Sequence, residues 1–161
     1  MDIVGRMGSA LIGGRIGIVA TLGMSAIMLL AKRAGLSGEL PPEAIADAIA
    51  EEMPTDKQPS EQDRDTFAVI MHFVFGGLAG VLYGFLAKDV VHPLRGTVLG
   101  MVFGSGVYAV SYLGWVPALR ILPPAHRDRP GRVATMVVAH WVYGALLGAL
   151  TAVGMSRREP T

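Results

Sequence analysis

The sequence contains no cysteine among its 161 residues. Disulfides, iron–sulfur clusters, thiolate zinc sites and cysteine nucleophiles are therefore excluded. Charge is scarce too, because charged residues make up 17% of the chain against roughly 25% in an average soluble domain. The 14 basic and 13 acidic residues nearly balance, so no overall charge favours nucleic acid as a partner. Hydrophobic residues make up 52% and the mean hydropathy is +0.47, which indicates a membrane protein.

Four apolar segments are long enough to cross a bilayer, which takes about 20 helical residues. They cover residues 8–31, 66–87, 96–116 and 133–155, and the last three contain no Asp, Glu, Lys or Arg. The segments lack the alternating polarity of barrel strands and are too few to close a barrel. The sequence predicts an all-α integral membrane protein, a four-helix bundle built from two tandem helical hairpins in one domain over residues 1–161.

Residues 32–65, between the first two spans, form an acidic extramembrane segment that holds nine of the thirteen acidic residues. Within it, the sequence PPEAIADAIAEEM places apolar side chains along one helical stripe: Ala44, Ile45, Ala48, Ile49 and Met53. This pattern predicts a short amphipathic helix lying against the bundle or the membrane interface. The following TDKQPSEQDRD is polar without apolar periodicity and predicts a flexible link.

The phrase MHFVFGGLAG at 71–80 returns as AHWVYGALLG at 139–148, which matches His72 with His140. The second span thus matches the fourth, which pairs Gly76 with Gly144 and Gly80 with Gly148. The first span matches the third at another offset, which pairs Gly13 with Gly96, Gly17 with Gly100 and Gly23 with Gly106. The two helical hairpins are therefore copies of one sequence repeat. Because both enter the bilayer in the same direction, they are expected to be parallel repeats about an axis along the membrane normal.

Small residues recur every four positions in these spans and so form strips along one helix face. Such strips let helix backbones approach closely in a bilayer and gain dispersion contact. We expect glycine-zipper packing at Gly76, Gly80, Gly84, Gly96, Gly100, Gly104, Gly144 and Gly148.

His72 and His140 begin two of these strips at equal depth, which makes them candidate functional residues at a central seam. Three interpretations are open: an interhelical hydrogen bond, a bis-histidine haem, and a proton or ion path. Five methionines could add soft metal ligands, namely Met24, Met28, Met71, Met101 and Met136. Methionine in an apolar bundle more often fills gaps, so no metal site and no resident cofactor are predicted, with haem kept as the alternative.

A Gly-rich first span ends in lysine and is followed by Leu-Pro-Pro, then by two His-aromatic helices that flank a Gly-rich third span. The residues that carry this order are Lys32, Leu40, Pro41, Pro42, His72, Phe75, Gly80, Tyr83, Gly96, Gly100 and His140. In this order the chain resembles the YagU-like family of small bacterial inner-membrane proteins. The resemblance implies a multi-pass protein of the bacterial inner membrane, without an established activity and loosely tied to acid tolerance. It supplies no catalytic residues.

The sequence shows no nucleophile elbow, phosphate loop, zincin or dinucleotide pattern, and an enzyme is not expected. It favours a non-enzymatic binding or transport-like module with His72 and His140 at its seam. The alternatives are a haem protein for electron transfer or sensing, and a structural subunit of a membrane complex. Membrane lipids and a homo-oligomer or larger membrane complex are the expected partners.

Overall fold

The computed structural model describes residues 3–157, and this part of the chain is helical without a β-strand. Its elements are α1 (Ile3–Arg33), α2 (Pro41–Glu51), η1 (Thr55–Lys57), α3 (Glu61–Leu86), α4 (Pro93–Val110), η2 (Ser111–Trp115), α5 (Val116–Ala118) and α6 (Pro130–Ser156). Within the described residues, four helices are long and apolar enough to cross a membrane, the third being the continuous run Pro93–Ala118. The predicted all-α membrane bundle, with a short helix after the first span, is confirmed.

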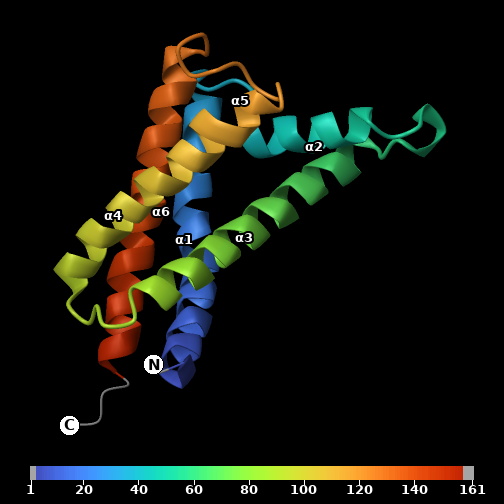
Figure 1. Ribbon diagram of the computed structural model, residues 1–161. Helices are drawn as coiled ribbons and strands as arrows, with labels where there is room; N and C mark the ends of the chain where they lie inside the picture. The colour runs from blue at the N-terminus through green and yellow to red at the C-terminus, as the bar shows by residue number, and fades with distance from the viewer. Residues whose placement is uncertain (1–2, 158–161) are drawn as a thin grey trace.

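The long helices pack as two pairs, α1 with α3 and α4 with α6, and the pairs meet mainly through α1 and α6. We call these the first and second helix pair. In Figure 1, α1 and α4 run upward while α3 and α6 run downward, so the two pairs have the same direction. Toward its N-terminal end α3 leans away from α4 and α6, and α2 lies across that end. The bundle is therefore closed on one side and splayed on the other.

Inside each pair the helix backbones approach closely because glycines face each other. A Cβ atom on Gly80 would clash with the carbonyl oxygen of Gly13 and would lie 2.8 Å from the Cα atom of Gly17. In the second pair, a Cβ atom on Gly100 would clash with the carbonyl oxygen of Gly144 and would lie 2.9 Å from the Cα atom of Gly148. Since lipid tails are as apolar as leucine, helix association depends on such close contacts.

The remaining predicted glycines lie in the same two interfaces. Gly76 and Gly84 of α3 face α1, and Gly96 and Gly104 of α4 face α6. These contacts join helices of one chain. The two sets also coincide under the sequence match, because the Gly13–Gly80 contact corresponds to that between Gly96 and Gly148.

The start of the second span differs from the prediction. Ser60 is the N-cap of α3, and its hydroxyl accepts a hydrogen bond of 3.2 Å from the amide of Asp63. Residues 61–65 are thus the first turn of a long helix and not a flexible link. Glu61 and Asp63 favour this start because acidic side chains near a helix N-terminus interact well with the helix dipole.

The amphipathic helix α2 buries only part of the predicted stripe, since Ala44 is buried and Ile45 packs against the core. Its buried residues are Ala44, Ala46 and Ala50, whereas Ile49 is 48% exposed and Met53, just beyond the helix, is 40% exposed. The small alanine side chains allow α2 to pack closely against α3. The larger Ile49 and Met53 side chains are left on the outer surface.

Candidate functional site

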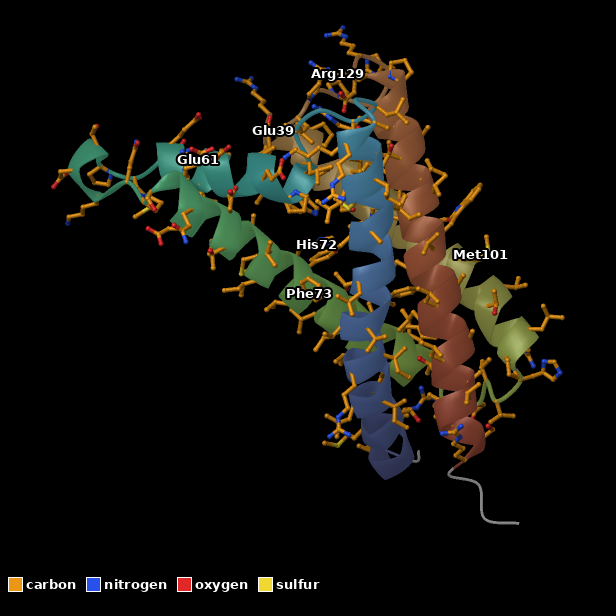
Figure 2. All side chains as sticks on the ribbon, turned by 180° about the vertical axis from the view of Figure 1, so that it is seen from behind. Glu39, Glu61, His72, Phe73, Met101 and Arg129 are labelled. Carbon is orange, nitrogen blue, oxygen red and sulfur yellow. The ribbon has the colours of Figure 1, made fainter. Side chains whose placement is uncertain are left out.

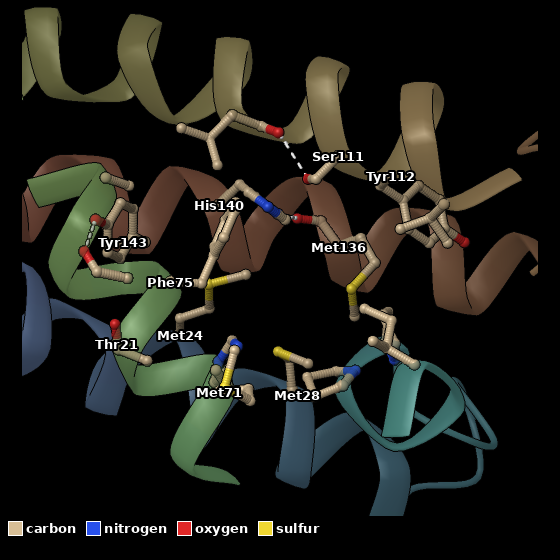
Figure 3. A pocket seen from close by; sticks show the side chains of 18 of the residues that line it. Thr21, Met24, Met28, Met71, Phe75, Ser111, Tyr112, Met136, His140 and Tyr143 are labelled. Carbon is tan, nitrogen blue, oxygen red and sulfur yellow. Dashed lines mark hydrogen bonds between the residues drawn. The ribbon is translucent and has the colours of Figure 1, made fainter. Parts of the chain in front are cut away.

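A cavity of about 190 Å³ lies between the two helix pairs, and we call it the central cavity. Side chains from α1, α3, α4, η2, α5 and α6 form its walls (Figure 3), and Pro41, Pro42 and Ile45 of α2 line it as well. Each lining side chain among the described residues is uncharged. The few polar groups that face this space are therefore the ones that decide what it accepts.

The cavity exists because the two seams between the helix pairs are not equally closed. At Gly23 of α1, a Cβ atom would lie 2.5 Å from the Cδ1 atom of Leu146 on α6, so this seam is tight. Its counterpart in the repeat is Gly106 of α4, where nothing lies within 4 Å of a Cβ atom. Contacts between α4 and α3 are correspondingly few. The contacts inside the two helix pairs thus follow the sequence repeat, whereas the contacts between the pairs do not.

Both histidines predicted at the seam line the central cavity. His140 is 6% exposed, and its Nδ1 atom lies 2.7 Å from the carbonyl oxygen of Met136, one turn earlier on α6. Because a carbonyl oxygen can only accept, this Nδ1 carries the proton of a neutral ring, which leaves the Nε2 atom with a lone pair. Tyr108 packs edge-on against the His140 ring, with 5.4 Å between ring centroids. His140 is thereby held in one orientation.

His72 differs from His140 in its hydrogen bonding. Its Nε2 atom is buried and makes no hydrogen bond with any residue in the part of the chain that the structure describes. An unpaired buried polar atom costs about 1–3 kcal/mol. A ligand that satisfied this nitrogen would recover some of that cost.

Four of the five methionines singled out in the sequence line the central cavity, namely Met24, Met28, Met71 and Met136. Figure 3 shows their thioether ends directed into the space that the His140 ring also faces. Met101 of α4 does not line this cavity. The fold thus collects sulfur-bearing side chains from three helices around two imidazoles.

A π-helical turn, η2, interrupts the third span beside the cavity. It carries Ser111, Tyr112 and Trp115 into the cavity wall. Single π turns inside α-helices occur frequently at functional sites. The sequence analysis did not identify this wall; Pro117 was the available signal, because a proline inside a helix lacks the amide proton that the regular pattern needs.

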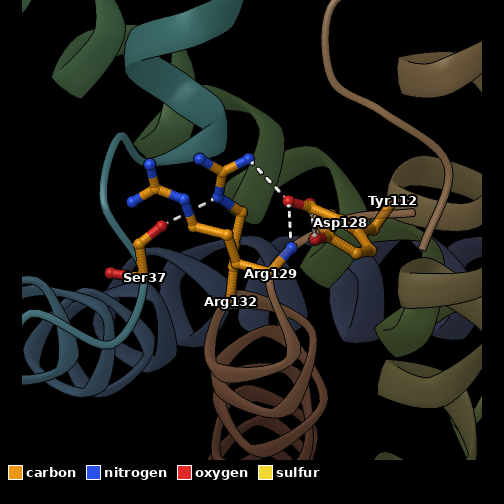
Figure 4. A network of polar contacts seen from close by, with 5 residues as sticks. All are labelled: Ser37, Tyr112, Asp128, Arg129 and Arg132. Atoms are coloured by element: carbon orange, nitrogen blue, oxygen red, sulfur yellow. Dashed lines mark hydrogen bonds and ion pairs between the residues drawn. The ribbon is translucent and has the colours of Figure 1, made fainter. Parts of the chain in front are cut away.

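A polar network joins this wall to the loops (Figure 4). Asp128 pairs with Arg132 at 3.0 Å, and the two side chains are only 1% and 8% exposed. The hydroxyl of Tyr112 donates to the second oxygen of Asp128, and the Nε atom of Arg132 donates to the carbonyl oxygen of Ser37 at 2.9 Å. The network holds the segment after α1, the η2 turn and the start of α6 together.

A second, polar cleft of about 690 Å³ lies between α1, α2 and α3, and His72 lines it as well as the central cavity. Its walls carry five carboxylates and two basic side chains: Glu39, Glu43, Asp47, Glu61, Asp65, Lys32 and Arg64. Figure 2 shows Glu39 and Glu61 beside α2 and His72 farther along α3. Ion pairs of Glu43 with Lys32 at 2.7 Å and of Asp47 with Arg64 at 2.8 Å fix α2 between its neighbours.

The geometry limits which cofactors fit. Pockets for drug-sized ligands measure about 300–1,000 Å³, and haem belongs to this size class. The central cavity, at about 190 Å³, is smaller than this size class. Among residues 3–157 there is also no group of three or more His, Cys, Asp or Glu side chains that could hold a metal ion.

Comparison with known proteins finds a family and no characterised relative. The profile of a family of unknown function (DUF6789) matches residues 4–161. No curated protein and no solved structure matches the chain. Nothing in these comparisons links the chain to the YagU-like proteins or to a bacterial source.

Proposed function

The chain belongs to this family of unknown function, and we propose that it is a non-enzymatic binding or transport-like membrane protein whose ligand occupies the central cavity. One observation carries the proposal. The two halves of the repeat each bring one histidine, His72 and His140, to the wall of the same largely apolar space. Intramembrane ionisable side chains are expensive to keep and commonly mark a functional site.

The splayed side of the bundle supplies a route to this cavity. Val142 and Leu146 of α6 pack on Gly23 in the closed seam. Their counterparts in the repeat are Val74 and Leu78 of α3, which are 45% and 63% exposed. The same residue types are thus exposed on α3, whereas on α6 they pack against a helix. We propose that α3 moves toward and away from α4, and that this movement opens the central cavity to a ligand.

The ring nitrogens of the two histidines determine which chemical group the ligand needs. His72 has an unpaired buried Nε2 atom, and His140 retains a lone pair on its Nε2 atom. A ligand therefore needs a group that bonds to one or both nitrogens and a body no larger than the cavity. Lipid acyl chains surround the outer faces, as the exposure of Leu22 and Val102, at 58% and 65%, supports. Assembly into a homo-oligomer and residence in a bacterial inner membrane stay predictions.

A cavity-filling substitution tests the proposal. Val107 lines the central cavity, whereas Val110, one turn later on α4, is 70% exposed. Native mass spectrometry of protein released from membranes in detergent should show a retained small ligand in the wild type and in Val110→Phe, and none in Val107→Phe. An equal ligand content in all three proteins, including none in any of them, contradicts the proposal. Thermal unfolding of the two variants checks that both remain folded.

A structural subunit would behave differently. Replacing both histidines with leucine would then leave ligand content and assembly unchanged. Under our proposal, the His72→Leu and His140→Leu variants stay folded and lose the retained ligand.

A further inference from the structure

We propose that the ligand of the central cavity is a soft monovalent metal cation of the Cu(I) class, held by methionine thioethers and histidine imidazoles. The inference rests on the proposed function, because it names the ligand class of the same cavity. It begins from the donor atoms that the fold brings together. Met24, Met28 and Met136 are 8%, 3% and 1% exposed, and Met71 and the two histidines complete the set.

The absence of charged side chains among the described residues that line the cavity favours an ion of low charge. Thioether and imidazole ligands are neutral, and each described side chain that lines the cavity is uncharged. The cost of moving an ion into a medium of low dielectric constant rises with the square of its charge, so a divalent ion without a carboxylate partner is strongly disfavoured. Soft sulfur ligands select Cu(I) over the harder ions that carboxylates bind. The donor set and the apolar surroundings therefore point to the same class of ion.

The histidine geometry fits a metal ligand. Metal-binding histidines almost always donate their second ring N–H to a carboxylate or a backbone carbonyl. His140 does this through its Nδ1 atom, which lies 2.7 Å from the carbonyl oxygen of Met136, so that Nε2 is the free donor. His72 offers a buried Nε2 atom without a hydrogen-bond partner. Coordination would satisfy both nitrogens at once.

Packing alone does not explain the methionines. Under the repeat, Met24 and Met28 correspond to Val107 and Ser111, and Met136 corresponds to Ala68. These three counterparts line the same cavity. The helix arrangement thus accepts small residues without sulfur at equivalent places. A role beyond filling space accounts for a thioether in only one member of each matched pair.

The polar cleft supplies an aqueous approach for a cation. Five carboxylates and two basic side chains line it, which gives an excess of negative charge. Fixed negative charge raises the local concentration of cations. His72 lies in the wall between this cleft and the central cavity, and it would be the first coordinating side chain that an ion meets.

The test is a titration of the purified full chain with Cu(I) in detergent under a reductant, in competition with the Cu(I) chelator bicinchoninate, and a parallel titration with Ag(I). The wild type should bind one ion. The double variant Met24→Leu/Met28→Leu should lose more than about tenfold in affinity, and His140→Leu should lose a similar amount. Met101→Leu is the matched control and should bind like the wild type. X-ray absorption of the Cu(I) form should show sulfur and nitrogen ligands together.

Two results overturn the inference. They are the absence of stoichiometric Cu(I) or Ag(I) binding to the wild type, and equal affinities of the double variant and Met101→Leu. Leucine and methionine have similar volumes, so these variants should fold, and thermal unfolding verifies it. If the metal fails to bind while Val107→Phe still removes a retained organic ligand, the proposed function survives and this inference does not. If neither is observed, both fail.

Discussion

Tyr143 of α6 and Gly76 of α3 are joined across the central cavity by a hydrogen bond of 2.6 Å, in which the phenol hydroxyl donates to the glycine carbonyl oxygen. The bond ties the two helix pairs together at the wall where both residues line the cavity. The counterpart of Tyr143 in the repeat is Phe75, which has no hydroxyl. Of these two matched residues, only Tyr143 can donate such a bond, and the bond limits how far α3 can move from α6.

Removing the hydroxyl should loosen this wall. In Tyr143→Phe, the free energy of unfolding should fall by about 1 kcal/mol, the net value of a typical hydrogen bond. Tyr108→Phe is the control, because the Tyr108 hydroxyl makes no hydrogen bond with a described residue, and it should change stability by less than about 0.5 kcal/mol. Chemical denaturation in mixed micelles measures both. Equal losses in the two variants would show that the Tyr143 bond does not hold the pairs together.

Glycines should differ sharply in their tolerance of a methyl group. Gly80→Ala places a Cβ atom against the backbone of α1, which cannot yield as a flexible side chain would, and should destabilise by about 1–3 kcal/mol. Gly106→Ala enters open space and should be neutral or slightly stabilising, because alanine is the better helix former. Thermal unfolding of the purified variants ranks them. A loss at position 106 equal to that at 80 would mean that another surface covers Gly106.

The proposed movement of α3 predicts a cross-link that the static structure does not contain. Since the chain has no cysteine, pairs can be introduced cleanly. Gly23→Cys with Leu146→Cys tests the seam that is already closed and should form a disulfide readily. Gly106→Cys with Leu78→Cys should form one more slowly, at the rate at which α3 approaches α4. Gel mobility under mild oxidation measures both rates.

The control for this experiment is Ser105→Cys with Leu78→Cys, because Ser105 lies on another face of α4, where its hydroxyl accepts a hydrogen bond from Trp141 of α6. It should remain unlinked. If the Gly106 and Leu78 pair also remains unlinked while the Gly23 and Leu146 pair reacts completely, the open seam is fixed and access by movement of α3 is wrong.

Much of the fold could be predicted from the sequence because a bilayer restricts the possibilities. Long uncharged runs must be helices, and short connections make consecutive spans antiparallel. The repeat then matched each hairpin to the other, and the close contact of Gly13 with Gly80 has its counterpart in that of Gly96 with Gly148. These features depend on local sequence and on how closely two helix backbones can approach. The glycine pattern in the sequence shows directly where such an approach is possible.

The shape of the site could not be predicted in the same way. The sequence treats Gly23 and Gly106 as equivalent, yet only one of this pair has a helix against it. That difference depends on the balance of contacts over whole helices, including the Tyr143 bond and the position of α2. The buried face of α2 was predicted only in part for a related reason. Two ion pairs, Lys32 with Glu43 and Asp47 with Arg64, fix its position together with its contacts with α3.

The ion pair of Asp128 and Arg132 should contribute more to stability than any exposed pair. Both side chains are almost fully buried, and removing one partner leaves a buried charge without its ion-pair partner, which costs about 3–5 kcal/mol. Arg132→Met should therefore destabilise strongly and free the segment around Ser37, whose carbonyl oxygen loses its donor. Lys88→Met breaks a pair in which Asp89 is 80% exposed and should cost at most about 1 kcal/mol.

A double-mutant cycle separates the pair from its surroundings. Because Asp128→Leu combined with Arg132→Met leaves no unpaired charge, the double variant should lose less than the sum of the two single variants by more than about 1 kcal/mol. Tyr112→Phe alone should cost about 1.5–3 kcal/mol, since its hydroxyl donates to a charged acceptor. Denaturation in mixed micelles gives the four free energies. Additive losses would mean that Asp128 and Arg132 act independently, and the η2 wall of the cavity would then depend on the Tyr112–Asp128 hydrogen bond and not on the ion pair.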